Sequence, residues 1–188
     1  MSFTIEKDRH IFACWAASRA AGASPLCRFK VEKGKEILDE IFGKDGKRAL
    51  DNSLKENQKE FDDYHDDIIK RVIEESKKNE IQRKEYPKDK NFIDGMSYGV
   101  AAKLINLYFK VIFICGNYKD NPRINYIHPP IDSLLLDSLY KEKKDKLWKE
   151  TWSNMTSERY KKIIDGIKKE ITENDGLWSI EKHWEGHQ

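Results

Sequence analysis

Residues 96–115 read MSYGVAAKLINLYFKVIFIC, a segment that would be apolar nearly all round if it formed a helix. A helix without a polar face belongs in the interior of a domain. Asn106 and Lys110 interrupt the apolar run Leu104–Cys115, which is too short and too polar to span a bilayer. The segment therefore predicts a buried central helix.

This predicted helix carries a single polar stripe. Gly99, Lys103, Asn106 and Lys110 are spaced by four, three and four residues, so they share one helical face. In one interpretation the stripe touches water, and the lysine stems lie along the core. In the other the stripe lines a cleft, where a partly desolvated Lys103 acts as a nucleophile or binds phosphate.

The segments outside the central helix are also mostly helical in pattern. Residues 5–21 place Phe12, Trp15, Ala16 and Arg19 on one face, which predicts a partly buried and paired Arg19. Further helices are expected over 30–42, ending at Gly43; one or two over 46–84, before Pro87; and over 156–172 and 176–184. Strand patterns are almost absent. The fold class is therefore expected to be all-α, a compact helical bundle with residues 1–188 in one domain.

Composition limits the function further. The 188 residues are 38% hydrophobic and 36% charged, with a net charge of +2, so a nucleic-acid partner would need a local basic patch. Cys14, Cys27 and Cys115 are dispersed, which argues against disulfides and against a zinc site. The N-terminus has no apolar signal core. We expect a cytoplasmic monomer without a metal, a cofactor or a membrane partner.

A second polar element follows the central segment at residues 127–132, IHPPID. Pro129 and Pro130 are expected to start the next helix, because proline is tolerated in a first turn. Asp132 would then lie in that first turn, where the helix dipole stabilises a carboxylate. Many helices start with such an acid; the same geometry is also a rigid way to aim one carboxylate at a substrate.

Together, the two elements YGVAAKLINLYFK and HPPIDSLLL resemble the catalytic half of helix-hairpin-helix DNA glycosylases, closest in pattern to the archaeal 8-oxoguanine branch. That family places a lysine near the start of one helix and an aspartate at the head of the next. The resemblance covers about a quarter of the chain and implies a glycosylase-like helical fold with Lys103 and Asp132 as catalytic residues. Residues 93–99 replace the usual hairpin, and the chain lacks a four-cysteine cluster.

The resemblance implies excision of a damaged or modified base from duplex DNA, in repair or in defence against phages with modified DNA. Cleavage of the glycosidic bond passes through an oxocarbenium-like state that Asp132 would stabilise, or Asp132 would activate water. Lys103 would attack C1′, with or without a later strand-cleaving step. The base must flip into a pocket. Candidate pocket and DNA contacts are Trp15, Arg19, Ser97, Tyr98, Gly99, Asn106, Tyr108, Lys110 and His128.

Two other classes of function remain open. Arg123 and His128 fit the R-x4-H pattern of HEPN ribonuclease toxins. That pattern requires both residues on one helix, whereas Pro122 and the pair Pro129–Pro130 bracket the segment and disfavour one. The third possibility is a helical interaction protein without catalytic activity.

Overall fold

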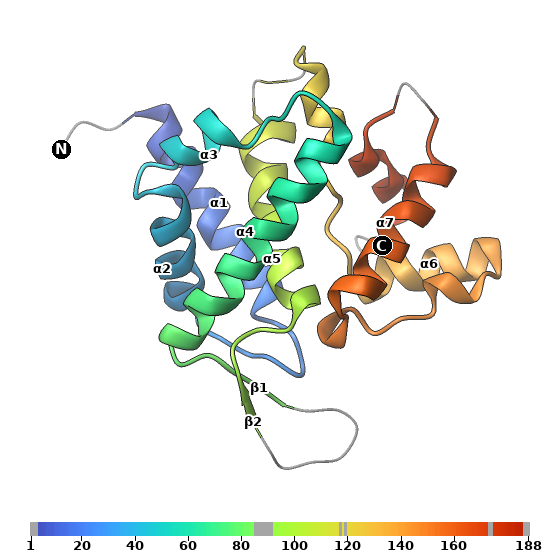
Figure 1. Ribbon diagram of the computed structural model, residues 1–188, viewed down its shortest axis with the longest axis horizontal. Helices are drawn as coiled ribbons and strands as arrows, with labels where there is room; N and C mark the ends of the chain where they lie inside the picture. Colours follow the sequence, from blue (N-terminus) through green and yellow to red (C-terminus); the bar gives the residue numbers. More distant parts are fainter. Residues whose placement is uncertain (1–3, 85–91, 117, 119, 173–174, 186–188) are drawn as a thin grey trace.

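Helices make up most of the computed structural model, which describes residues 4–84, 92–116, 118, 120–172 and 175–185 (Figure 1). The α-helices are α1 (Ile5–Ala21), α2 (Val31–Phe42), α3 (Lys47–Asn52), α4 (Gln58–Lys78), α5 (Tyr98–Phe109), α6 (Ser133–Lys143) and α7 (Ser157–Glu170). Shorter turns are η1 (Lys110–Ile114), η2 (Pro122–Tyr126), η3 (Lys146–Trp148), η4 (Trp152–Asn154) and η5 (Leu177–His183). Strands β1 (Gln82–Lys84) and β2 (Phe92–Asp94) pair antiparallel, with Arg83 opposite Ile93. The all-α fold class is confirmed.

Polar side chains cap the N-termini of most of the long helices. The side chain of the residue before the helix accepts a backbone N–H at Thr4, Asn57, Ser97, Asp132 and Thr156. Each cap satisfies one of the donors that a helix start leaves without an intrahelical partner. The first turn of α2 is different, because its cap residue Lys30 makes no such hydrogen bond.

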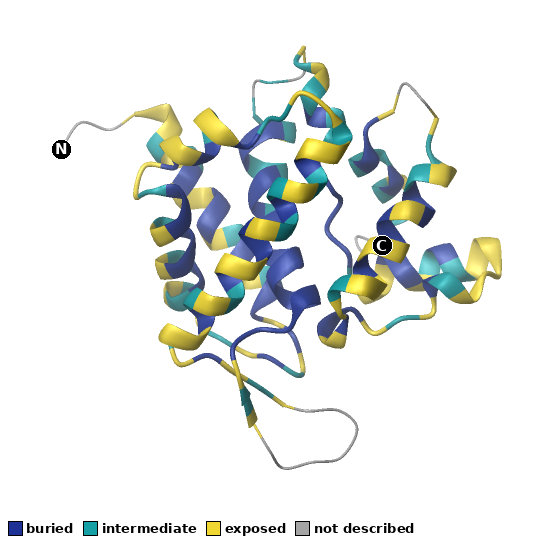
Figure 2. Cartoon of the chain, in the orientation of Figure 1, coloured by how far each residue is buried: buried dark blue, intermediate teal, exposed yellow. Residues whose placement is uncertain are grey.

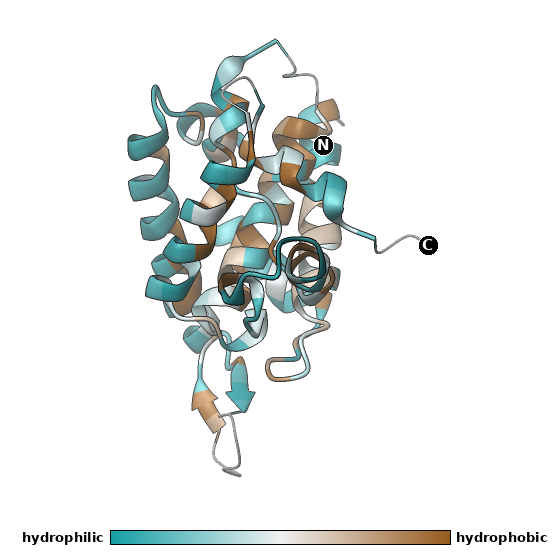
Figure 3. Ribbon diagram, turned by 90° about the vertical axis from the view of Figure 1, so that its right-hand side faces the viewer, coloured by the Kyte–Doolittle hydropathy of each residue, from teal (hydrophilic) through white to brown (hydrophobic). Residues whose placement is uncertain are grey.

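Helix α5 occupies the centre, and eleven of its twelve residues are buried. Helices α1, α2 and α4 lie on one side of it, while α6, α7 and the C-terminal turns lie on the other (Figure 1). The buried positions face inward between these helices, and the outer turns are exposed (Figure 2). The outer turns are also largely hydrophilic (Figure 3). The predicted buried central helix is therefore confirmed, although regular α-helix ends at Phe109 and a wider π turn continues it.

Small residues let α1 and α2 approach closely. A Cβ at Gly34 of α2 would lie 2.2 Å from the Oγ of Ser18 on α1. Ala13, Ala17 and Ala21 on α1 are fully buried. The α1–α2 contact therefore depends on side chains that leave the backbones room to meet.

Most predicted helix bounds agree with the structure. The helices over 5–21 and 30–42 are confirmed, and the polar segment 46–84 contains α3 and α4 followed by β1. Pro87 lies outside the described residues. The prediction that Pro129 and Pro130 start a helix was wrong: residues 129–132 are extended, and α6 begins at Ser133. The C-terminal segment 176–184 forms a 3-10 helix rather than an α-helix.

The predicted burial of the α1 face was wrong. Phe12 is 57% exposed and Trp15 52% exposed, and the two rings stack with centroids 5.8 Å apart. Arg19 is exposed and has no ion pair with any described residue. The opposite face, which carries the alanines, packs into the core. Among the described residues, no helix is long and apolar enough to cross a bilayer.

Candidate functional site

Lys103 and Asp132 meet across the junction of α5 and α6. The Nζ atom of Lys103 lies 3.4 Å from Oδ2 of Asp132. Their side chains are only 11% and 16% exposed. The predicted approach of these two side chains is confirmed, and it joins a cation and an anion that are largely shielded from water.

Asp132 is held rigidly because it caps α6 rather than lying within its first turn. Its backbone is extended, and its Oδ1 atom accepts the N–H of Leu135 at 3.0 Å. The indole Nε1 of Trp184 donates to the same oxygen at 3.2 Å. The remaining oxygen, Oδ2, faces Lys103. The carboxylate is therefore fixed by the helix start and by the C-terminal turn together.

Lys103 lies over an aromatic ring. Its Nζ atom is 4.3 Å from the centroid of Trp152 in η4, a favourable position for a cation. Gly99, one turn earlier, allows this approach, because a Cβ there would lie 1.8 Å from the carbonyl oxygen of Trp152. Burial lowers the pKa of Lys103, and the attraction to Asp132 opposes that shift. A lowered pKa raises the fraction of neutral, nucleophilic amine.

A cavity of about 150 Å³ opens beside the pair. Ala20 of α1, Leu107 of α5 and Pro130 form its apolar walls. The cavity is small compared with the 300–1,000 Å³ of clefts that hold drug-sized ligands, so it suits a small planar group.

The C-terminal turn contributes polar groups to this cavity. Lys110 and Glu181 form an ion pair, and Trp184 lines the wall next to Asp132. The Oε1 atom of Glu181 is buried without a partner. Burial raises the pKa of Glu181, while Lys110 opposes the shift. A ligand in the cavity would therefore meet two amines, two carboxyl groups and an indole.

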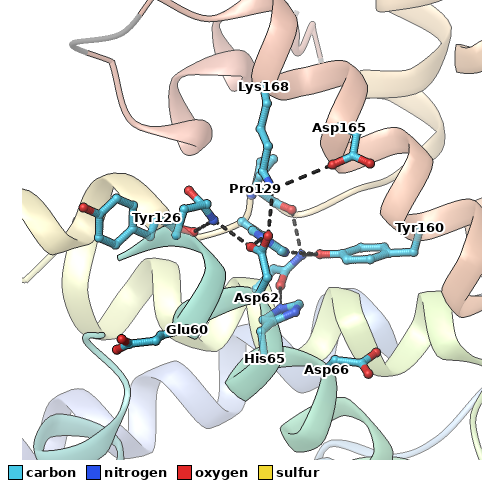
Figure 4. Close-up of polar contacts among 12 residues, drawn as sticks. Glu60, Asp62, His65, Asp66, Tyr126, Pro129, Tyr160, Asp165 and Lys168 are labelled. Carbon is cyan, nitrogen blue, oxygen red and sulfur yellow. Dashed lines mark hydrogen bonds and ion pairs between the residues drawn. The ribbon is translucent and has the colours of Figure 1, made fainter. Parts of the chain in front are cut away.

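Asn106 lies in a second polar cluster rather than in the cavity beside Lys103. Figure 4 shows this cluster around His65, Tyr160 and Asp62. Its Nδ2 atom donates to the carbonyl of Pro129 at 2.7 Å and to Tyr160 at 2.9 Å. Its Oδ1 atom therefore accepts from Nε2 of His65, at 2.6 Å. His65 keeps a lone pair on Nδ1, which is buried without a partner. Burial, with His128 nearby, lowers the pKa of His65 to about 3.

His128 belongs to the same cluster. Tyr160 donates its hydroxyl to Nδ1 of His128 at 3.1 Å, and Nε2 of His128 donates to Asp62 at 2.9 Å. Asp62 also accepts from Lys168 at 2.7 Å. Burial would raise the pKa of Asp62, but the hydrogen bonds from His128 and Lys168 hold it well below its usual range. His128 and Tyr160 are almost fully buried, and the cluster joins α4, α5 and α7. With Asp62, His65 and Lys168 they line a cavity of about 260 Å³ between α4 and α7.

The other candidate contacts are spread over the fold. Ser97 caps α5 and donates to the carbonyl of Ser153, while Tyr98 donates to Asp66 at 2.7 Å on the α4 side. Tyr108 is in the core, and Trp15 and Arg19 are on the surface. Of the predicted site residues, the cavity brings together Lys103, Lys110 and Asp132. The polar stripe is not a solvated face, because Lys103 is 9% exposed and Asn106 1%.

Three residues of this site were missed by sequence reasoning: Trp152, Glu181 and Trp184. They lie far along the chain from Lys103, and their spacing from it matches no periodic pattern. The accumulation of tryptophans near the C-terminus was the only signal, and it did not indicate which ring meets which carboxylate.

Arg123 and His128 do not share a helix. Arg123 lies in η2, which ends at Tyr126, and it pairs with Glu56 at the surface at 2.5 Å. His128 is 4% exposed and belongs to the internal cluster. The predicted interruption of the R-x4-H segment is confirmed.

One group among the described residues has the spacing of metal ligands, namely His10, Cys14 and Asp39. His10 already donates from Nε2 to Asp39 at 2.9 Å and accepts from Tyr108 at Nδ1 at 2.8 Å. Burial raises the pKa of the Cys14 thiol to about 12. The hydrogen bonds account for His10 as a structural residue without an ion.

Comparison of the chain with protein-family models, with curated proteins and with solved structures finds no match.

Proposed function

We propose that this protein is a DNA glycosylase that excises a damaged or modified base, with Asp132 and Lys103 as its catalytic residues. The observation that carries the proposal is the meeting of Lys103 Nζ and Asp132 Oδ2, 3.4 Å apart, beside a small cavity. The sequence resemblance names the same two residues. The pair supplies the two groups that the proposed cleavage uses, a carboxylate to stabilise the sugar cation and an amine as nucleophile.

Asp132 would act on the sugar. As the bond between C1′ and the base breaks, the base leaves with the electron pair and positive charge develops on the sugar ring. A fixed carboxylate in a poorly hydrated site stabilises that charge without having to reorganise. The three groups that surround Asp132, namely the N–H of Leu135, the indole of Trp184 and the amine of Lys103, support this fixed role.

Lys103 would act as the nucleophile. Burial lowers its pKa, which raises the fraction of neutral amine, and the neutral Nζ atom would form a bond to C1′ as the base departs. Nζ would then pass a proton to Asp132, the bond between C1′ and the ring oxygen O4′ would break, and O4′ would take the electron pair and that proton. This leaves a protonated imine between Nζ and C1′, the species that precedes strand cleavage. The cavity beside the pair is the place for the extruded base, with Glu181 and Lys110 as its hydrogen-bonding groups.

Two alternatives are less well supported. An RNA-cleaving site of the HEPN class would use Arg123 and His128, which the fold separates into a surface and an interior position. An interaction protein without catalytic activity would not need a desolvated lysine beside a fixed carboxylate, although such pairs also occur as structural ion pairs.

The experiment is to incubate the protein with duplex DNA carrying damaged or modified bases and to count alkali-sensitive abasic sites. Borohydride added during the reaction reduces an imine and links the protein to DNA. We expect abasic sites with the wild type, and a borohydride adduct that maps to Lys103 and is absent from Lys103→Gln. Lys44→Gln, an exposed lysine elsewhere on the surface, is the matched control. The proposal fails if no tested DNA accumulates abasic sites above the level without protein.

A further inference from the structure

A separate, basic pocket lies where α1 ends and α2 begins. It has a volume of about 590 Å³ and is open to solvent. Arg19, Arg28 and Lys30 line it and are all exposed. None of the three forms an ion pair with any described residue, and Glu32 is the sole carboxylate in the lining. Three cationic residues thus line one hollow with a single carboxylate beside them.

Backbone donors face the same hollow. The first turn of α2 starts at Val31, and its cap residue Lys30 offers no side-chain acceptor. The N–H groups of Val31 and Glu32 have no acceptor within the helix, because a helix start leaves its first donors free. The helix dipole adds positive potential at that end of this twelve-residue helix. Both effects favour an anion.

A buried hydroxyl provides an independent sign of a missing partner. Ser18 lines the pocket and is 0% exposed, yet its Oγ atom has no hydrogen-bond partner. Leaving a buried hydroxyl unsatisfied costs free energy, so such groups are rare unless a ligand or water completes them. The hydroxyl-bearing Ser18, the start of α2 and the three cations all belong to the lining of one pocket.

The loop that carries Arg28 is well ordered by its own contacts. Ala23 and Arg28 form an antiparallel bridge, and Oγ of Ser24 accepts the N–H groups of Leu26 and Cys27. Lys84 N–H of β1 donates to the carbonyl of Leu26 at 2.7 Å. Arg28 is thus held near the start of α2 before any ligand arrives, which reduces the entropy lost on binding.

We propose that this pocket binds a phosphate group, and that the source of the phosphate is the backbone of a DNA strand. The three cations and the N–H groups at the start of α2 are all hydrogen-bond donors. A phosphate offers several charged acceptor oxygens that suit such donors. Its assignment to DNA rests on the proposed glycosylase function. Helix α1 connects the two sites, because Arg19 lines the basic pocket and the next residue, Ala20, lines the cavity beside Lys103. A helix with its side chains is about 10 Å wide, which corresponds to about three base-pair steps of a DNA strand.

The binding of phosphate itself is tested with inorganic phosphate. In a titration followed by amide NMR, the N–H signals of Val31 and Glu32 should shift most. The double variant Arg28→Gln/Lys30→Gln should weaken the apparent affinity by about tenfold or more, since each charge-assisted contact contributes on that scale. Lys44→Gln, which removes an exposed charge beyond the other end of α2, should bind phosphate like the wild type.

The assignment to DNA is tested with duplex oligonucleotides over a range of salt concentrations. The double variant should reduce the slope of log K against log salt by about 0.9, because the pocket holds one phosphate and each neutralised phosphate contributes about 0.9. Lys44→Gln should leave the slope unchanged. Asp132→Asn should also leave it unchanged, so a failure of the catalytic proposal is distinguishable from a failure of this one.

Two results would overturn the inference. If the double variant and Lys44→Gln have the same apparent affinity for inorganic phosphate, the pocket is not a phosphate site. If the double variant loses phosphate binding but keeps the wild-type salt slope on DNA, the pocket serves a small phosphorylated molecule and the assignment to DNA is wrong.

Discussion

Replacing Asp132 with asparagine separates the charge of this residue from its structural role. Asparagine is as good a helix cap as aspartate, so its side-chain oxygen can still accept the N–H of Leu135. The charge that faces Lys103 disappears. Because Asp132 is the group that raises the pKa of Lys103 against burial, the variant lowers that pKa further and favours the neutral amine.

The effects of Asp132→Asn on stability and on the excision rate have different expected magnitudes. Breaking a buried ion pair costs about 3–5 kcal/mol when the other charge stays in place. Here Lys103 keeps the ring of Trp152 and can release its proton, so we expect a loss of unfolding free energy at or below about 3 kcal/mol. Excision should fall much more, by about 10²–10³-fold, as when one preorganised electrostatic group is removed from an active site.

The assay is single-turnover excision at saturating protein, with alkali-sensitive sites counted over time. Circular dichroism and chemical denaturation establish the folded fraction under the same conditions. Asp137→Asn provides a matched control, because Asp137 is an exposed acid on the same helix without a described ion pair. If folded Asp132→Asn excises at the rate of Asp137→Asn, Asp132 has no catalytic role.

Three further outcomes follow from the structure. Lys103→Gln should lose the borohydride adduct while retaining the fold by circular dichroism; an adduct of wild-type yield would assign the nucleophile elsewhere. His65 has a folded-state pKa of about 3 against an ordinary value of 6.5, so the unfolded chain takes up the proton first and stability is lost as the pH falls below about 6.5. Protonation of His65 in the unfolded chain should lower the free energy of unfolding by about 2 kcal/mol at pH 5 relative to pH 7. In His65→Gln, the difference between the unfolding free energies measured at pH 7 and pH 5 should be smaller by that amount. Gly34→Ala should lower the unfolding free energy by about 1–3 kcal/mol, since its Cβ would overlap Ser18; a neutral result in thermal denaturation would contradict the close α1–α2 contact.

Much of the helical framework could be predicted from local sequence signals. The segment 96–115 is apolar enough that burial was its only stable position, and α5 is indeed in the centre. Gly43 ends α2 with a φ of +82°, a conformation that costs glycine little. The placement of Lys103 and Asp132 near the starts of consecutive α-helices, with prolines fixing the chain just before Asp132, likewise predicted that they would meet.

The orientation of α1 could not be predicted in the same way. Its most hydrophobic side chains, Phe12 and Trp15, are exposed, while alanines, Cys14 and Ser18 are buried. A hydropathy pattern counts the apolar area of each side chain, but the close approach of α2 and α5 requires small side chains at the contact. Which face is buried was therefore decided by the shape of the neighbouring helices.

The sequence by itself determined most of the helical framework, the burial of α5 and the approach of Lys103 to Asp132. Only the tertiary structure brought Trp152, Glu181 and Trp184 to them, turned Asn106 toward His65, and gathered Arg19, Arg28 and Lys30 at one helix start. The physical reason is the distance along the chain over which each interaction acts. Caps, periodicity and proline act over a few residues, whereas the packing of distant helices is settled by the shapes and polar partners that all of them present together.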